Sequence, residues 1–187
     1  IRQWCLKFGP HFKNVIKKRA LRPSDKWHLD EQQLRIRGAT YYLWRAVDDE
    51  GYELDVFLQK RRNKKAAIRF LSRLLNAHPQ PRVIVTDRLR SYTKPIRQMG
   101  KGVEHRSHKG LNNRVENAHQ PTRRKEKCLI RFKSPAGAQS VIALMGTTRN
   151  LFAVAVGRYT KPAQQRRKQF LAAKEIWNDA VLELLCV

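Results

Sequence analysis

Alternating apolar and polar residues mark three consecutive strands in the first third of the chain. Residues 27–36 and 53–61 alternate in the manner of a half-buried strand, and residues 41–48 between them are aromatic and β-prone. Short turns separate them, the first at Gly38 and the second at residues 48–51, Asp-Asp-Glu-Gly. Because such short connections join antiparallel neighbours, the pattern predicts a three-stranded meander. We expect Tyr42 and Trp44 in its core.

The periodicity changes to that of a helix over residues 63–78. Its apolar residues recur at spacings of three and four, opposite a basic face, which is typical of a helix packed on a core. Asn63 is suited to cap the start, and His78 precedes a proline that ends the helix. Residues 82–87 then form a short run rich in β-branched residues, which predicts a strand buried on both faces in a parallel arrangement.

The remaining segments extend this order with further helices and one strand. We expect a short helix near residues 91–102 interrupted by Pro95, a strand at 103–108, and helices at 111–131, 137–152 and 163–185. Residues 1–19 are predicted to form helical pieces broken at Gly9-Pro10. The order from residue 27 is β-β-β-α-β-α-β-α-α. It predicts an α/β fold with a mixed five-stranded sheet flanked by helices, which matches the ribonuclease H-like arrangement.

The charge of the chain points to a polyanionic partner. Lys and Arg number 40 against 15 Asp and Glu, which gives a formal net charge of +25 and a pI near 10.9. Such an excess favours nucleic acid, because every neutralised phosphate releases counterions. Basic runs such as 60–62, 123–125 and 166–168 are spread along the chain. This distribution indicates a folded domain with a basic face or channel rather than a charged tail.

Cysteine content and hydropathy exclude two other classes of protein. The three cysteines, Cys5, Cys128 and Cys186, are far apart and form no C-x-x-C pair, so neither a disulfide framework nor a Cys-rich zinc site is indicated. No apolar run approaches the length of a membrane span. We therefore expect a protein of the reducing cytoplasm with no membrane partner.

Three carboxylates are placed where they could carry chemistry. Asp30 follows the apolar lead-in Trp-His-Leu of the first strand, and Asp87 ends the buried run of the fourth. An unpaired carboxylate beside such a strand is costly unless a cation balances it. Glu116 lies on a predicted helix. Two Asp from neighbouring strands and one Glu from a helix could hold two divalent ions for an in-line displacement at phosphorus. Each acid taken alone also fits a turn, a cap or a solvated helix charge.

Five segments resemble the insertion-sequence-six family of bacterial transposases, over residues 1–152 of the chain. They are WHLDE (27–31), YLWRAVDDEG (42–51), VTDRLRSY (85–92), EHRSHKGLNNRVENAHQPTRRKE (104–126) and RFKSPAGAQ (131–139). The resemblance implies a ribonuclease H-like, retroviral integrase-type core. It also implies a DDE triad of Asp30, Asp87 and Glu116. Two Mg²⁺ or Mn²⁺ ions would be held by these three residues as catalytic and metal-binding ligands.

The family's reaction and partners are expected to follow the same resemblance. Members cut at the ends of their element and join a 3′-hydroxyl to target DNA, which implies DNA as partner, a homo-oligomer on DNA and a bacterial, nucleoid-associated protein. We expect phosphate contacts beside the triad. The candidates are Arg88, Arg90, Lys109, Asn113, Arg114, His119, Arg123, Arg124 and Lys125.

Two departures from the family pattern bear on domain organisation. Only 28 residues separate Asp87 from Glu116, fewer than is usual for such triads. Intact members also carry an N-terminal helix-turn-helix, and IRQWCLKFGP resembles only its last helix. The expected organisation is a remnant of that domain at 1–19, a DDE catalytic core at 27–152 and a C-terminal helical tail at 153–187. Two alternatives stay open: a truncated remnant that only binds DNA non-specifically, and a nuclease that cuts without joining.

Overall fold

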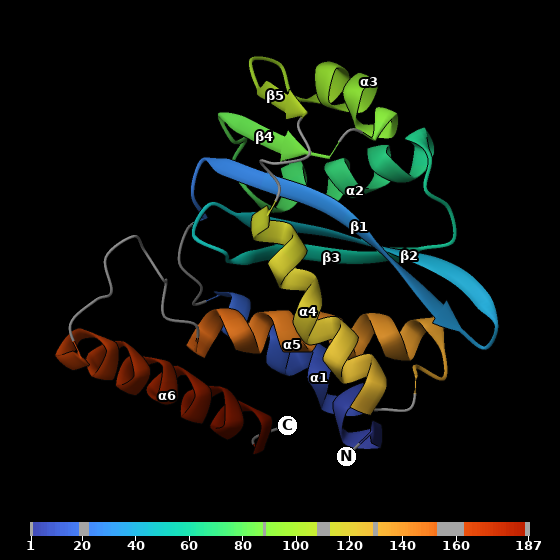
Figure 1. Cartoon of the computed structure of the whole chain (residues 1–187). Coiled ribbons are helices and arrows are strands. Elements are labelled where there is room, and N and C mark those ends of the chain that lie inside the picture. Colours follow the sequence, from blue (N-terminus) through green and yellow to red (C-terminus); the bar gives the residue numbers. More distant parts are fainter. Residues whose placement is uncertain are drawn as a thin grey trace. The chain divides into compact units, whose positions relative to one another are not determined.

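The chain forms two units in the computed structural model, which describes residues 2–18, 23–87, 89–107, 113–128, 131–152 and 163–185. Residues 23–139 make up the unit that holds the sheet, and residues 1–22 with 140–187 make up a helical unit. Figure 1 shows the elements of both units along the chain. The mixed five-stranded sheet flanked by helices, predicted from the order of the elements, is confirmed.

The predicted meander forms one half of the sheet. Strands β1 (Lys26–Ile36), β2 (Ala39–Asp48) and β3 (Glu53–Gln59) pair in antiparallel order. The β1–β2 hairpin turns on Arg37 and Gly38, whose φ angles of 50° and 80° are both left-handed. Two such residues make the type I′ turn, whose twist matches that of the strands, and a glycine in the second place removes the strain there.

The second half of the sheet is parallel to its central strand. Strand β4 (Val83–Thr86) pairs with β1 on one side and with β5 (Glu104–Ser107) on the other, which gives the order β3-β2-β1-β4-β5 (Figure 1). All four residues of β4 are buried, as its continuous apolar run predicts. Strands β1 and β4 therefore run in the same direction, and β1 continues beyond the last residue that pairs with β4.

Helices α2 (Lys64–Ala77) and α3 (Arg90–Met99) pack on one face of the sheet and enclose its main core. Asn63 caps α2 by accepting a hydrogen bond from the Ala66 amide at 3.0 Å, as predicted. Trp44 is fully buried in this core and Tyr42 packs against it. Helix α3 continues through Pro95, so the predicted interruption is wrong. Burial of Pro95 and its neighbour Ile96 offsets the one backbone hydrogen bond that proline removes.

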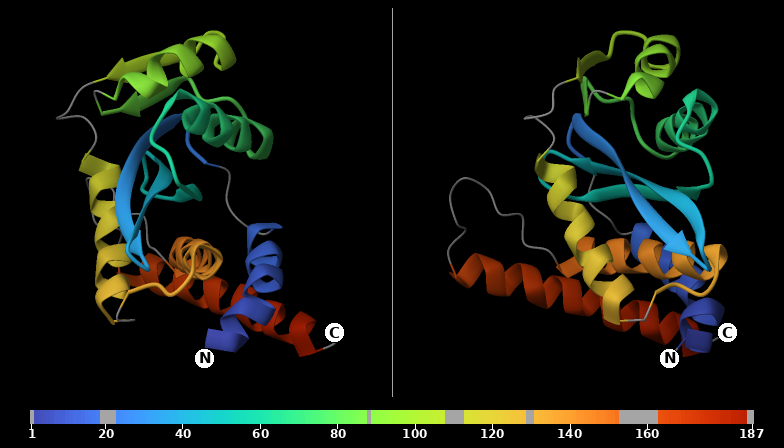
Figure 2. Two further views of the ribbon diagram at one scale, coloured as in Figure 1. Left: turned by 90° about the vertical axis from the view of Figure 1, so that its right-hand side faces the viewer. Right: turned by 45° about the vertical axis from the view of Figure 1, so that its right-hand side comes forward.

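Helix α4 (Asn113–Cys128) contacts β1 and β2 from the opposite face, where Ala118 packs on Val47. The left view of Figure 2 shows α4 and α2 on the two sides of the sheet. The first turn of α5 (Pro135–Phe152) also belongs to this unit. There the Gln139 side chain accepts from the Leu58 amide and donates to the Val56 carbonyl, satisfying the outer edge of β3.

The helical unit contains α1 (Arg2–Lys18), the rest of α5, and α6 (Ala163–Leu185). Phe12 of α1 meets Trp177 of α6 edge-on, with ring centroids 4.5 Å apart. Helix α1 runs unbroken through Gly9-Pro10, so the predicted break there is wrong. Packing of Phe12 and Ile16 against the other helices supports the helix beyond the proline. Within the described residues, every helix is too short or too polar to cross a membrane.

Candidate active site

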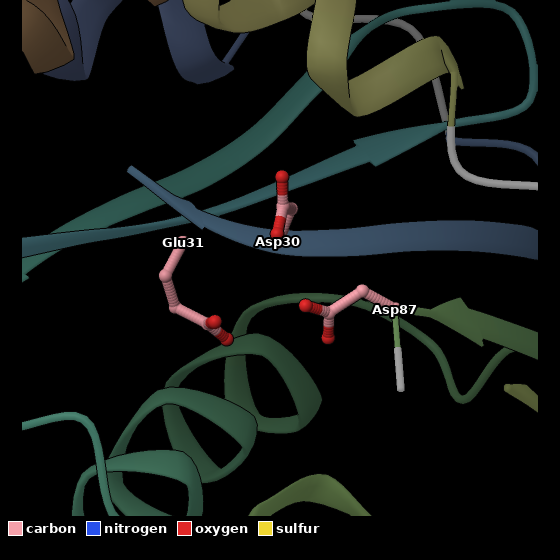
Figure 3. A group of neighbouring side chains, drawn as sticks. All are labelled: Asp30, Glu31 and Asp87. Carbon is pink, nitrogen blue, oxygen red and sulfur yellow. The ribbon is translucent and has the colours of Figure 1, made fainter. Parts of the chain in front are cut away.

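The candidate site lies where the pairing of β1 with β4 stops. The last paired residues are Leu29 and Thr86, and each is followed by an aspartate. Asp87 thus follows the carboxyl end of β4, whereas Asp30 lies within β1, at the point where β1 continues beyond β4 and stays paired with β2. Together with Glu31, they bring carboxylate oxygens within 4.8 Å of one another (Figure 3). This is the edge at which open α/β sheets place their binding sites.

Strand alternation sends Asp30 and Glu31 to opposite faces of the sheet. Asp30 is the cross-strand partner of Arg45 and shares its face with α4. Glu31 is the partner of Trp44 and extends into the face covered by α2 and α3. Figure 3 shows the Asp30 and Glu31 side chains leaving β1 in different directions, with the Asp87 carboxyl turned toward Glu31. The carboxylates of Asp30 and Glu31 thus approach the end of the β1–β4 pairing from opposite faces of the sheet.

Asp87 is held by one backbone and one side-chain contact. Its Oδ1 accepts from the Leu89 amide at 3.0 Å, and its Oδ2 accepts from Arg62 Nη2 at 3.2 Å. The side chain is 32% exposed, so the carboxyl group is partly accessible from solvent. Arg62 also donates through Nε to Glu31 at 2.9 Å and so bridges the two acids. A single guanidinium balances part of the negative charge gathered here.

Glu31 is a site residue that was not predicted from the sequence. Its side chain is fully buried, and the pKa of its carboxyl is raised to about 7. Burial is the main cause; the Asp30 charge adds to it, whereas the Tyr92 hydroxyl and the Arg62 guanidinium oppose it. The available signal was the Asp-Glu pair itself, since adjacent strand residues face opposite sides and one of them must enter the core.

Because the pKa of Glu31 is raised in the folded protein, the metal-free protein should be less stable above pH 7 than below pH 4.5. The pKa of Glu31 in the folded protein lies above the ordinary 4.5. The stability that protonated Glu31 contributes is therefore fully present below pH 4.5 and is lost as pH rises through about 7. We expect the free energy of unfolding to fall by at most about 3 kcal/mol over this window relative to Glu31→Gln, which cannot ionise. Urea unfolding in chelator at several pH values measures it. A difference between the two proteins that is constant with pH would contradict the assignment.

On the other face, Asp30 contacts a buried network that fastens α4 to the sheet. Asp30 Oδ2 lies 3.1 Å from His119 Nε2 of α4. Arg45 donates to the Ala118 carbonyl, to Thr122 Oγ1 at 2.6 Å, and pairs through Nε with Glu53 at 3.1 Å. His119, predicted from the sequence to contact DNA, is 4% exposed and faces Asp30. The network sets the position of the helix that carries Glu116.

Removal of the Arg45 charge should therefore be costly. Arg45→Met keeps the length of the side chain but leaves the buried Glu53 carboxylate and the Ala118 carbonyl without this donor. Breaking a buried ion pair from one side costs about 3–5 kcal/mol, a large part of the stability of a domain. Urea unfolding measures it, with Arg35→Met as control because Arg35 is an exposed arginine on β1. Equal losses in the two variants would show that the network carries little energy.

The other residues predicted from the sequence fall into two groups. Arg90 is exposed at the start of α3, and Arg123, Arg124 and Lys125 are exposed on α4, so all four are accessible to DNA. Glu116, Asn113 and Arg114 belong to α4, but their side chains lie outside the described part of the structure, as do Arg88 and Lys109 altogether. The structure therefore brings Asp30 and Asp87 together and leaves the third acid of the triad as a prediction.

The donor set fits a hard divalent cation. Its ligand atoms are carboxylate oxygens, which Mg²⁺ and Mn²⁺ prefer, and they lie close enough to share an ion. Asp30 is 16% exposed and Asp87 32%, so a hydrated ion can reach both. Arg62 pairs with Asp87 and balances part of the clustered negative charge. The Arg62 side chain is 39% exposed. Nothing in the geometry of the described residues favours a nitrogen- or sulfur-ligated metal at this edge.

Comparison with known proteins agrees with this geometry. The family model of the DDE domain of IS240-type transposases matches residues 24–154. Transposases of Staphylococcus aureus for the element IS431mec and for IS257 in transposon Tn4003 are each 31% identical over 123 residues, which cover 63% of this chain and 55% of theirs. An uncharacterised Yersinia pseudotuberculosis protein is 35% identical over 81 residues, covering 42% of this chain and 76% of its own. The chain thus spans about half the length of the transposases it matches.

Solved structures share the fold at low sequence identity. The catalytic core domain of HTLV-2 integrase in complex with magnesium superimposes with a TM-score of 0.54 and 18% identity, covering 67% of this chain and 86% of that one. A simian T-cell lymphotropic virus intasome chain gives a TM-score of 0.52 at 18% identity, covering 66% and 48%. The predicted ribonuclease H-like, integrase-type core is therefore confirmed. The chain belongs to the DDE domain family, as a member of the insertion-sequence-six group of transposases.

Proposed function

We propose that this chain is the catalytic core of a transposase that cleaves DNA at insertion-sequence ends and joins the 3′-hydroxyl to target DNA. The observation that carries the proposal is the convergence of Asp30 and Asp87 where the pairing of the parallel strands β1 and β4 stops, in a DDE-family fold. The +25 charge of the chain supports DNA as both substrate and target. The similarity to S. aureus proteins that are named transposases supports the reaction class.

In this proposal the carboxylates of Asp30, Asp87 and Glu116 hold two Mg²⁺ or Mn²⁺ ions. When bound, such ions activate the attacking oxygen and stabilise the leaving oxygen of an in-line displacement. Asp87 is oriented for this role by the Leu89 amide and Arg62. The exposed residues Arg123, Arg124 and Lys125 of α4 would hold backbone phosphates beside the acids. The magnesium complex of the HTLV-2 integrase core supports the choice of ion.

The proposed organisation and assembly follow the family. Residues 1–19 would be the remnant of an end-reading domain, 27–152 the catalytic core and 153–187 a helical tail. A homo-oligomer would form on DNA, since two DNA ends must be joined to one target; the HTLV-2 integrase core with a similar fold is described as dimeric.

The experiment is a joining assay with short, pre-nicked element ends, which bypass end recognition, and a labelled target duplex. We expect longer joined products in Mg²⁺ or Mn²⁺ and none in chelator. Cutting of the duplex without joined products would favour the nuclease alternative. Duplex binding with neither product, in either ion, would favour a remnant that only binds DNA. Products that form equally well in chelator would overturn the proposal.

A further inference from the structure

A chain of three side chains, two of them buried, links the sheet, helix α4 and the candidate metal site. Arg45 Nη1 lies 3.4 Å from His119 Nδ1, and His119 Nε2 lies 3.1 Å from Asp30 Oδ2. Arg45 is 1% exposed, His119 is 4% exposed, and the Asp30 side chain is 16% exposed. The imidazole is thus placed between a cation and a carboxylate, with little access to water.

This placement decides which nitrogen of His119 carries its proton. An arginine guanidinium has donors only, so the nitrogen that faces Arg45 must be the acceptor. An ionised carboxylate has acceptors only, so the nitrogen that faces Asp30 must be the donor. Both contacts therefore require the Nε2–H tautomer, with a bare Nδ1. In the opposite tautomer, the Nδ1–H donor would face an N–H donor of Arg45, and the bare Nε2 acceptor would face an acceptor oxygen of Asp30.

An imidazole with its proton on Nε2 can donate to Asp30 from one fixed position only. The bond occupies one lone pair of Oδ2 and fixes the rotation of the carboxyl group.

We propose that His119 is a positioning residue, held in its Nε2–H tautomer by Arg45, that orients the Asp30 carboxylate for a divalent ion. The role rests on the metal site of the proposed function. Hydrogen-bonded partners of metal ligands fix the orientation of the ligand, and their loss weakens metal binding by about 10–100-fold. Helix α4 would thus serve the site twice, through Glu116 and through His119 one turn later.

Affinity for Mn²⁺, followed by the loss of the free-ion electron paramagnetic resonance signal, tests the role without reference to catalysis. We expect His119→Ala to bind Mn²⁺ about 10–100-fold more weakly. His119→Gln, whose amide can donate from a similar place, should recover most of that loss. Gln120→Ala, an exposed neighbour on α4, is the matched control and should match the parent. Equal affinity in His119→Ala and the parent, at equal thermal stability, would overturn the proposal.

Nitrogen-15 spectra of the imidazole test the tautomer in the unchanged protein. We expect the signals of a protonated Nε2 and a bare Nδ1 at neutral pH. An Nδ1–H tautomer or a doubly protonated ring would overturn the proposal even if every variant failed to fold. Failure of the proposed function can be distinguished from failure of this inference about His119. In that case Mn²⁺ binding would be insensitive to Asp87→Asn, whereas failure of this inference leaves binding sensitive to Asp87→Asn and insensitive to His119→Ala.

Discussion

Asp87→Asn is expected to abolish joining of pre-nicked ends while leaving duplex binding intact or slightly stronger. The substitution removes the charge of a central ligand, so an ion is lost and the remaining carboxylates are left to repel each other. Loss of one preorganised electrostatic contact costs about 10²–10³-fold, and loss of an ion should cost roughly 10³-fold or more. Non-specific binding should persist, because a negative charge is removed beside phosphate.

The measurement is the initial rate of joined product in Mg²⁺, with a filter-binding titration on the same duplex. Asp25→Asn is a suitable control, since Asp25 is an exposed aspartate that pairs with Arg82 at 3.0 Å, outside the group of converging acids. It should leave the rate close to that of the parent. An Asp87→Asn protein that joins ends at the parental rate would be decisive against the metal-ligand role.

Affinity for duplex DNA is expected to fall by about 10³-fold or more between 50 and 200 mM salt. A protein that neutralises six or more phosphates loses affinity on about this scale, by roughly 0.9 log unit per contact for each log unit of salt. The net charge of +25 makes contacts of this number reasonable. Because phosphate contacts carry no sequence information, element-end and scrambled duplexes should bind alike. A strong preference for one sequence that survives high salt would contradict this expectation.

Arg124→Ala should lower the slope of this salt dependence by about one unit, since one phosphate contact is lost. Arg124 is exposed on α4, the helix that carries Glu116. Arg124→Lys keeps the charge and is the control, for which the slope should be unchanged. Arg124→Ala with the parental slope would place the phosphate contacts elsewhere on the chain.

Local patterns in the sequence were sufficient to predict most of the elements. The alternation in 27–36 and the capped periodicity of 63–78 report directly on local backbone structure, and both elements form where expected. The breaks predicted at Pro10 and Pro95 do not occur. A proline removes one hydrogen bond, and side-chain packing from distant parts of the chain, which local patterns do not reveal, can offset it.

The part of the site that could be predicted from the sequence is the pair of acids next to buried apolar strand residues. Asp30 and Asp87 could be singled out because a carboxylate beside an apolar strand needs a partner, and the family resemblance named them. Glu31 and the burial of His119 could not be predicted in the same way. Both depend on which helix covers which face of β1: Glu31 meets Tyr92 and Arg62 on one side, and His119 meets Asp30 on the other. This information arises only when the chain is folded.

The most direct test of the two-metal account is the position of Mn²⁺ in crystals of the protein, located by anomalous diffraction. We predict Mn²⁺ coordinated by Asp30 and Asp87 at about 2.1 Å from their oxygens, with a second ion about 3.5–4 Å away when DNA is bound, and Glu116 among the ligands. Mn²⁺ bound elsewhere, with Asp30 and Asp87 free of metal at millimolar Mn²⁺, would contradict the account. So would a site in which Glu116 points away from a fully occupied ion.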